Sequence, residues 1–201
     1  MRFFGSLRSK KMTKVAIIYF SGYGHTVKQA EAVEKGAASV SGVSVTTIKI
    51  PEDGTIADSV WETLADADAI IFGSPTYMGG PAWQFKKFAD ESSKQFATMK
   101  WKDKVAGGFT TSASVNGDKF NTILYFFTLS QQHGQIWVGT GLQASNKLEH
   151  GPGDVNWTAG YSGALAIAPA DSSPEEGSSA GDQETARLYG ERVATFAAKL
   201  A

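Results

Sequence analysis

This sequence of 201 residues contains no cysteine. Disulfides, thiol catalysis and cysteine-ligated metal centres are therefore excluded. Its three histidines, His25, His133 and His150, lack the spacing of metal ligands, and no acidic cluster accompanies them. We therefore predict no metal site.

The sequence has no excess of charge and no long apolar run. Lys and Arg number 19 against 20 Asp and Glu, which gives a net charge of −1. Without a basic stripe, we expect no nucleic-acid partner. The apolar runs are far shorter than the ~20 residues of a membrane-spanning helix, so we expect no integral membrane segment. No apolar signal core follows the basic N-terminus, and we expect a cytoplasmic location.

Strands and helices alternate along the chain. Strands are predicted over residues 15–20, 43–50, 67–73, 105–111 and 135–138, and the main helices near 26–40, 59–64, 83–96, 121–132 and 183–200. This alternation is typical of an α/β protein with a doubly wound, five-stranded parallel sheet and helices on both faces. We predict the flavodoxin-like strand order 2-1-3-4-5, in one domain over residues 13–201 after an extension over residues 1–12 that we expect to be disordered.

A turn between the first strand and the first helix predicts an anion site. It reads Ser21-Gly22-Tyr23-Gly24-His25-Thr26. The first N–H groups of a helix have no backbone partner, and the helix dipole adds partial positive charge there. The turn lacks both G-x-G-x-x-G and the P-loop motif, so it suits a single phosphate monoester, as in flavin mononucleotide (FMN). The alternative is an ordinary strand–helix turn.

Two further loops follow neighbouring strands at the same edge of the predicted sheet. The first runs from Gly73 to Pro81 and the second from Thr110 to Gly117. Open α/β sheets bind ligands outside the carboxyl ends of their strands, where the strand order reverses. We therefore predict that these loops hold the two sides of a flat heterocycle while the first loop holds its phosphate.

Four segments resemble the flavodoxin-like NAD(P)H:quinone oxidoreductases of the tryptophan-repressor-binding-protein type: Ile18 to Thr26, Ala69 to Thr76, Gln132-His133-Gly134 and Glu184 to Leu200. The resemblance runs from about residue 14 to 200 and implies non-covalent FMN, NADH or NADPH as electron donor, a quinone as acceptor, and often a tetramer. The sequence departs from the family in the third loop, which has fewer glycines, and at Tyr77, where a basic residue is common.

The resemblance also implies which residues form the site. His133 would lie beside the flavin and act in catalysis. The alternative is that His133 is only a residue at the end of a helix, where the helix dipole stabilises it. The predicted cofactor-binding residues are Ser21, Gly22, Tyr23, Gly24, His25, Thr26, Pro75, Thr76, Tyr77, Met78, Gly79, Thr111, Ser112, Ala113, Ser114, Val115, Asn116, Gly117 and His133.

Three functions agree with this pattern. The first is an FMN-dependent enzyme that transfers two electrons from NADH or NADPH to quinones by a ping-pong mechanism, as a homo-oligomer, dimer or tetramer. The others are a one-electron carrier of the flavodoxin type and a flavin-binding regulatory protein. The segment 139–181 is long and irregular, and such loops are usually functional or disordered. The resemblance implies that it forms a lid over the site or a subunit contact.

Overall fold

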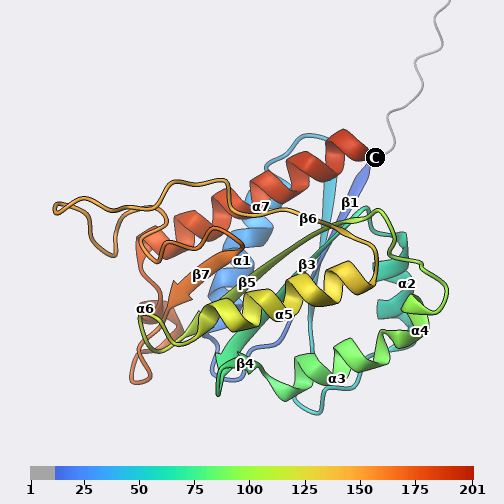
Figure 1. Cartoon of the computed structure of the whole chain (residues 1–201), viewed down its shortest axis with the longest axis horizontal. Helices are drawn as coiled ribbons and strands as arrows, with labels where there is room; N and C mark the ends of the chain where they lie inside the picture. The colour runs from blue at the N-terminus through green and yellow to red at the C-terminus, as the bar shows by residue number, and fades with distance from the viewer. Residues whose placement is uncertain (1–11) are drawn as a thin grey trace, which may run out of the picture.

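The computed structural model describes residues 12–201, so the predicted extension over residues 1–12 falls, apart from Met12, outside the described part of the chain. Figure 1 shows a central sheet with helices on both sides. The strands are β1 (Thr13–Tyr19), β2 (Val43–Lys49), β3 (Ala69–Tyr77), β4 (Gly80–Pro81), β5 (Val105–Ser112), β6 (Ile136–Trp137) and β7 (Ala164–Ile167). The helices are α1 (His25–Ala38), α2 (Asp58–Asp66), α3 (Trp83–Glu91), α4 (Ser93–Phe96), α5 (Lys119–Gln132), α6 (Pro174–Gly177) and α7 (Ala180–Leu200).

The sheet has the predicted order, β2-β1-β3-β5-β6, with all of these neighbours parallel. Its fifth position differs from the prediction because two short strands share it. β6 pairs with the start of β5 at Val105 and Ala106, and β7 pairs with its end from Phe109 to Ser112. A long insertion thus interrupts the fifth strand and returns the chain to the same sheet edge beside the end of β5.

The strands are continuous hydrophobic runs because an apolar core covers each face of the sheet. Alternate residues of β1, such as Ile17, face α1 and α7, while Ile18 faces the opposite core with α2, α3 and α5. The contact between α1 and α7 is very close, since a Cβ on Gly36 would lie 1.8 Å from the carbonyl oxygen of Arg187. Burial of both faces is what a parallel sheet requires.

Most predicted elements shift by one to a few residues at their ends, and three differ more clearly. The helix expected over residues 83–96 is two helices that meet at Ser92, and the strand expected over 67–73 continues as β3 to Tyr77. The last helix begins at Ala180 rather than near residue 183, because the Ser179 hydroxyl caps it by accepting from the Asp182 amide at 3.1 Å. In the described part of the chain, every helix is too short or too polar to span a lipid bilayer.

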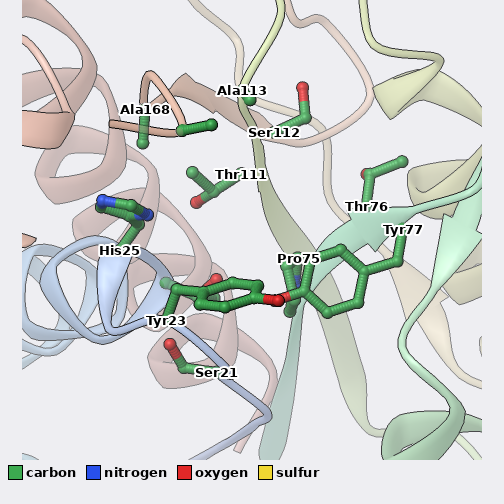
Figure 2. A pocket seen from close by; sticks show the side chains of 12 residues that line it. Ser21, Tyr23, His25, Pro75, Thr76, Tyr77, Thr111, Ser112, Ala113 and Ala168 are labelled. Carbon is green, nitrogen blue, oxygen red and sulfur yellow. The ribbon is translucent and has the colours of Figure 1, made fainter. Parts of the chain in front are cut away.

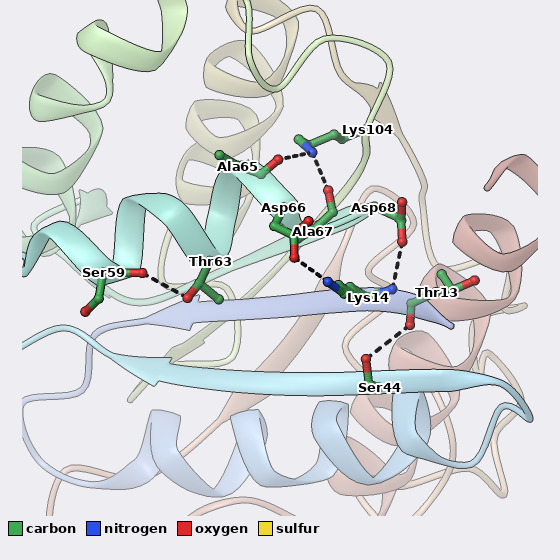
Figure 3. A network of polar contacts seen from close by, with 10 residues as sticks. All are labelled: Thr13, Lys14, Ser44, Ser59, Thr63, Ala65, Asp66, Ala67, Asp68 and Lys104. Atoms are coloured by element: carbon green, nitrogen blue, oxygen red, sulfur yellow. Dashed lines mark hydrogen bonds and ion pairs between the residues drawn. The ribbon is translucent and has the colours of Figure 1, made fainter. Parts of the chain in front are cut away.

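Hydrogen bonds and an ion pair connect the amino ends of neighbouring strands. The Lys14 amide donates to Asp68 Oδ2 at 2.8 Å, the Lys14 ammonium pairs with Asp66, and Lys104 Nζ donates to the carbonyl of Ala65 at 2.8 Å. Figure 3 shows this network linking β1 to the segments that precede β3 and β5. The loops of interest lie at the other, carboxyl end of the sheet.

Candidate cofactor-binding site

The loop after β1 presents the open N-terminus of α1. Gly24 precedes the helix with φ +94°, a left-handed conformation that favours glycine, and its amide donates to Ser21 Oγ at 3.2 Å. No side chain caps α1, and its first turn contains no acidic residue. Ser21 and Thr26 are both buried beside this helix end. The loop therefore leaves helix amides and hydroxyls available to an anion.

The loop after β3 is a hairpin. β3 runs through Thr76 to Tyr77, turns at Met78 and Gly79, and returns as β4. Both turn residues have positive φ, 48° and 79°, as tight hairpin turns require. The turn points Met78 fully into solvent, whereas Thr76 is buried with its Oγ1 2.8 Å from the Oγ1 atoms of both Thr110 and Thr122. Hydrogen bonds thus fix the backbone of β3 beside that of β5.

Gln29 of α1 ties the first helix to the end of the sheet. It is fully buried; its Nε2 donates to the carbonyl of Ala164 at 3.2 Å, and its Oε1 accepts from Thr111 Oγ1 at 2.7 Å. One side chain thereby sets the position of α1 relative to both β5 and β7. Because both the Nε2 and the Oε1 of this buried amide are hydrogen-bonded, a shift of α1 would leave a buried polar group without a partner.

A fourth segment, which follows β7, closes the site from the side of the insertion. The Ala168 amide donates to the carbonyl of Ser112 at 3.0 Å, and His25 Nε2 lies 3.0 Å from the carbonyl oxygen of Ser172. Helix α6 packs on the first loop so tightly that a Cβ on Gly24 would meet Pro174 Cγ at 2.6 Å. The sequence pattern gave no indication of this contact.

These four segments enclose a cavity of about 420 Å³, a volume usual for cofactor sites. Figure 2 shows its side chains converging from the three strand ends and from the segment after β7. It is lined by Ser21, Tyr23, His25, Thr26, Pro75, Thr76, Tyr77, Thr111, Ser112, Ala113, Ala168 and Ala170. Hydroxyl and small apolar groups dominate, and the lining contains no Asp, Glu, Lys or Arg.

Two tyrosines stand together at one side of the cavity. The rings of Tyr23 and Tyr77 are 6.1 Å apart between centroids and meet edge to face at 71°. Tyr23 is 77% exposed and Tyr77 37%, so both rings offer accessible aromatic surface (Figure 2). Burial raises the pKa of the Tyr77 phenol above its ordinary value.

The sequence matches the NADPH-dependent FMN reductase family over residues 3–121. The chain belongs to this family. It is 43% identical over 189 residues to flavodoxin FldP of Pseudomonas aeruginosa (strain UCBPP-PA14), covering 94% of this chain and 99% of the relative. Among solved structures, a WrbA-like flavodoxin from Agrobacterium tumefaciens is 46% identical, covers 94% of this chain and 99% of its own, and superposes with a TM-score of 0.76.

A more distant structure shows the fold alone. A flavodoxin from the domain Archaea is 18% identical, covers 92% of this chain and 99% of its own, and gives a TM-score of 0.58. The predicted flavodoxin-like fold and the resemblance to the tryptophan-repressor-binding-protein type are thus confirmed. This is a family of FMN-dependent reductases and flavodoxin-like proteins.

The cavity's chemistry fits FMN. A single helix N-terminus with flanking hydroxyls matches one phosphate, and the absence of carboxylates from the lining removes repulsion toward it. The backbone of Gly22 lies close to the Tyr77 side chain, since a Cβ on Gly22 would be 2.8 Å from the Tyr77 hydroxyl. Pro75, Thr76 and Ala113 of the second and third loops line the cavity beside this first loop.

Most of the predicted binding residues line this cavity or belong to its loops. Gly22 and Gly24 shape the first loop, whereas Met78 and Gly79 form the hairpin turn. Ser114 and Gly117 are absent from the lining, and Val115 and Asn116 line a second cavity beside α5. Ala168 and Ala170 line the cofactor cavity without having been predicted. The continuous apolar run Ala-Leu-Ala-Ile-Ala over residues 164–168 is the signal that indicates a strand there.

The structure does not bring His133 to the cavity. His133 follows the last turn of α5, near the amino ends of the strands, and is 2% exposed. Its Nε2 lies 2.9 Å from Ser92 Oγ, and its ring packs on Trp101 at 4.3 Å between centroids. Burial lowers the pKa of His133 to about 4. A catalytic or flavin-binding role for His133 therefore has no geometric basis in the cavity described above.

Proposed function

We propose that this protein binds FMN non-covalently and transfers two electrons from NADPH or NADH to quinones. Bound in the cavity, FMN would supply the redox chemistry by taking a hydride from the nicotinamide and passing its two electrons to the acceptor. Ser21, Thr26 and the first amides of α1 would hold the phosphate. Pro75, Thr76 and the loop after β5 would orient the ring system.

The observation that carries this proposal is the convergence of three loops on one uncharged cavity. They follow β1, β3 and β5, at the point where the strand order reverses, as ligand sites in open α/β sheets do. The first loop offers helix amides and hydroxyls to one phosphate, and the other two loops line the rest of the cavity. Family membership supports the choice of a flavin for that space.

Tyr23 and Tyr77 support a shared binding place for donor and acceptor. Their exposed rings stand beside the cavity, where a nicotinamide or a quinone would find aromatic surface. If both substrates use this place, each must leave before the other binds. Ping-pong kinetics, with parallel double-reciprocal lines when both substrates are varied, are the expected result; intersecting lines would contradict the shared place.

The function is tested by NADPH and NADH oxidation with benzoquinone as acceptor. Thr26→Glu places a carboxylate at the phosphate cradle and should abolish activity by preventing FMN binding, whereas Thr98→Glu, in the exposed segment after α4, should leave it intact. A protein that binds FMN but oxidises neither nicotinamide would refute the enzymatic proposal.

The name of the Pseudomonas relative favours a second candidate function, one-electron transfer between proteins as a flavodoxin. Such a carrier would usually present a strongly acidic face, and this chain has 20 acids against 19 bases. The benzoquinone assay separates the two functions, since a carrier needs a partner reductase before it accepts electrons from NADPH.

We also propose that the protein forms a dimer or tetramer. Phe120, Leu124 and Phe127 are 57%, 43% and 39% exposed at helical spacing along α5, which makes an apolar row on the surface. A sedimentation equilibrium measurement tests this. Paired aspartate substitutions at Phe120 and Leu124 should shift the protein toward the monomer.

A further inference from the structure

Lys119, the first residue of α5, is a buried lysine whose donors all point to one loop. Its side chain is 1% exposed. Its Nζ donates to Ser112 Oγ at 2.9 Å, to the carbonyl of Ser114 at 2.7 Å and to that of Val115 at 2.9 Å. An ammonium group has three donors, so these bonds use all of them. Ser112 is the last residue of β5, and Ser114 and Val115 lie in the segment that follows it.

The position of Lys119 links this loop to the cofactor cavity. Ser112, which accepts one of its bonds, lines that cavity, while Lys119 itself lines a second cavity of about 480 Å³ against residues 158–163. Lys119 therefore stands in the wall between the two. No Lys or Arg lines the cofactor cavity itself. The Lys119 ammonium is a buried positive charge that is separated from this cavity by the Ser112 side chain.

Asp182 of α7 is the titratable group that faces Lys119 from a neighbouring element. It is 2% exposed; its Oδ2 accepts from the Ile167 amide at 2.9 Å, and its Oδ1 has no hydrogen-bond partner. Burial lowers the pKa of Lys119 to about 8, and the attraction of Asp182 opposes that change. The ammonium form thus predominates at neutral pH and is lost at mildly alkaline pH.

We propose that Lys119 is a positioning residue of the FMN site, which fixes the loop after β5 and favours negative charge in the adjoining cavity. This proposal rests on FMN binding as proposed above. Charge-assisted hydrogen bonds are the strong ones, and three of them tie Lys119 to the end of β5 and to the segment that follows it. A buried cation also stabilises the negative charge that a flavin gains on reduction, because solvent screens the interaction between two charges less inside a protein than in water.

The matched test compares Lys119→Met with Lys104→Met. Lys104 also donates to backbone carbonyls, those of Ala65 and Ala67, but it does so at the opposite end of the sheet (Figure 3). Lys119→Met should raise the dissociation constant of FMN by about tenfold or more and lower the midpoint potential of the bound flavin, as expected for the loss of a charged hydrogen-bond donor. Lys104→Met should change the dissociation constant of FMN by less than about twofold and should leave the midpoint potential of the bound flavin unchanged.

A wild-type measurement covers the case in which Lys119→Met does not fold. FMN affinity should fall as the pH rises from 7.5 to 9, because an anion prefers the protonated lysine, and the affinity for uncharged riboflavin should fall less. A flat FMN affinity over this range would overturn the proposal. So would a Lys119→Met protein with unchanged FMN affinity and potential, or equal losses in Lys104→Met. A wild-type protein that binds no FMN would instead refute the proposed function itself.

Discussion

Acidification should destabilise the protein through His133. The ring is 2% exposed, its Nδ1 has no hydrogen-bond partner, and only Ser92 contacts its Nε2 by a hydrogen bond. Burial therefore favours the neutral ring and lowers its pKa from 6.5 to about 4. Above pH 6.5 the ring is neutral in both the folded and the unfolded chain. Below that pH only the unfolded chain binds the proton, so stability is lost as the pH falls toward 4.

The magnitude follows from this difference. One pKa unit corresponds to about 1.4 kcal/mol, so the contribution of His133 to the unfolding free energy should fall by about 2.5 kcal/mol between pH 7.5 and 4.5. His133→Leu removes the titrating group and keeps an apolar side chain against Trp101. Ser92 retains its bond to the carbonyl of Ala89 at 2.6 Å. The variant should then stay within about 1.5 kcal/mol of wild type at pH 7.5.

Urea unfolding of both proteins at pH 7.5 and 4.5 measures the difference. Carboxylates also titrate in this range, but they are common to both proteins and cancel in the comparison. The wild type should lose about 2.5 kcal/mol more than His133→Leu. Equal losses would refute the reasoning. Quinone reduction at pH 7.5 should be unchanged in the variant, and a large loss of turnover there would restore a catalytic role for His133.

Further variants test the framework of the site. Gly24→Ala should cost about 1–2 kcal/mol of stability through its left-handed φ and should weaken FMN binding, because its Cβ would displace Pro174 from the first loop; melting curves and FMN titration check both. Gln29→Leu should cost about 2–4 kcal/mol in urea unfolding, since the Thr111 hydroxyl and a backbone carbonyl lose their buried partner. Gly190→Ala should cost about 3 kcal/mol, because its Cβ would lie 2.0 Å from a backbone oxygen of α1.

The sequence allows prediction of the sheet order and of the three loops that form the cavity. Both depend on local signals: continuous apolar strands, helical periodicity, and glycine and hydroxyl residues directly after the strands. The fifth strand is different. β7 has only four residues, and its place in the sheet depends on pairing with the end of β5, which lies about fifty residues earlier in the chain. Local patterns carry no information about such a pairing.

Sequence patterns did not predict the roles of three single residues, His133, Gln29 and Lys119. α5 starts beside the cavity and runs toward the amino ends of the strands, so a residue at its last turn must lie far from the loops. This follows from topology rather than from the motif around His133. Gln29 and Lys119 look like ordinary helix residues in the sequence, and their roles depend on acceptors that only the folded chain brings to them.

The cradle at the start of α1 is the central feature of the proposed site, and FMN and riboflavin titrations of the purified protein test it directly. The two ligands share the ring system and differ in the phosphate. The cradle predicts that FMN binds at least tenfold more tightly, as expected for an anion held by helix amides and hydroxyls. Thr26→Glu should reduce the affinity for FMN far more than that for riboflavin. Equal affinities of the wild-type protein for FMN and riboflavin would contradict the account.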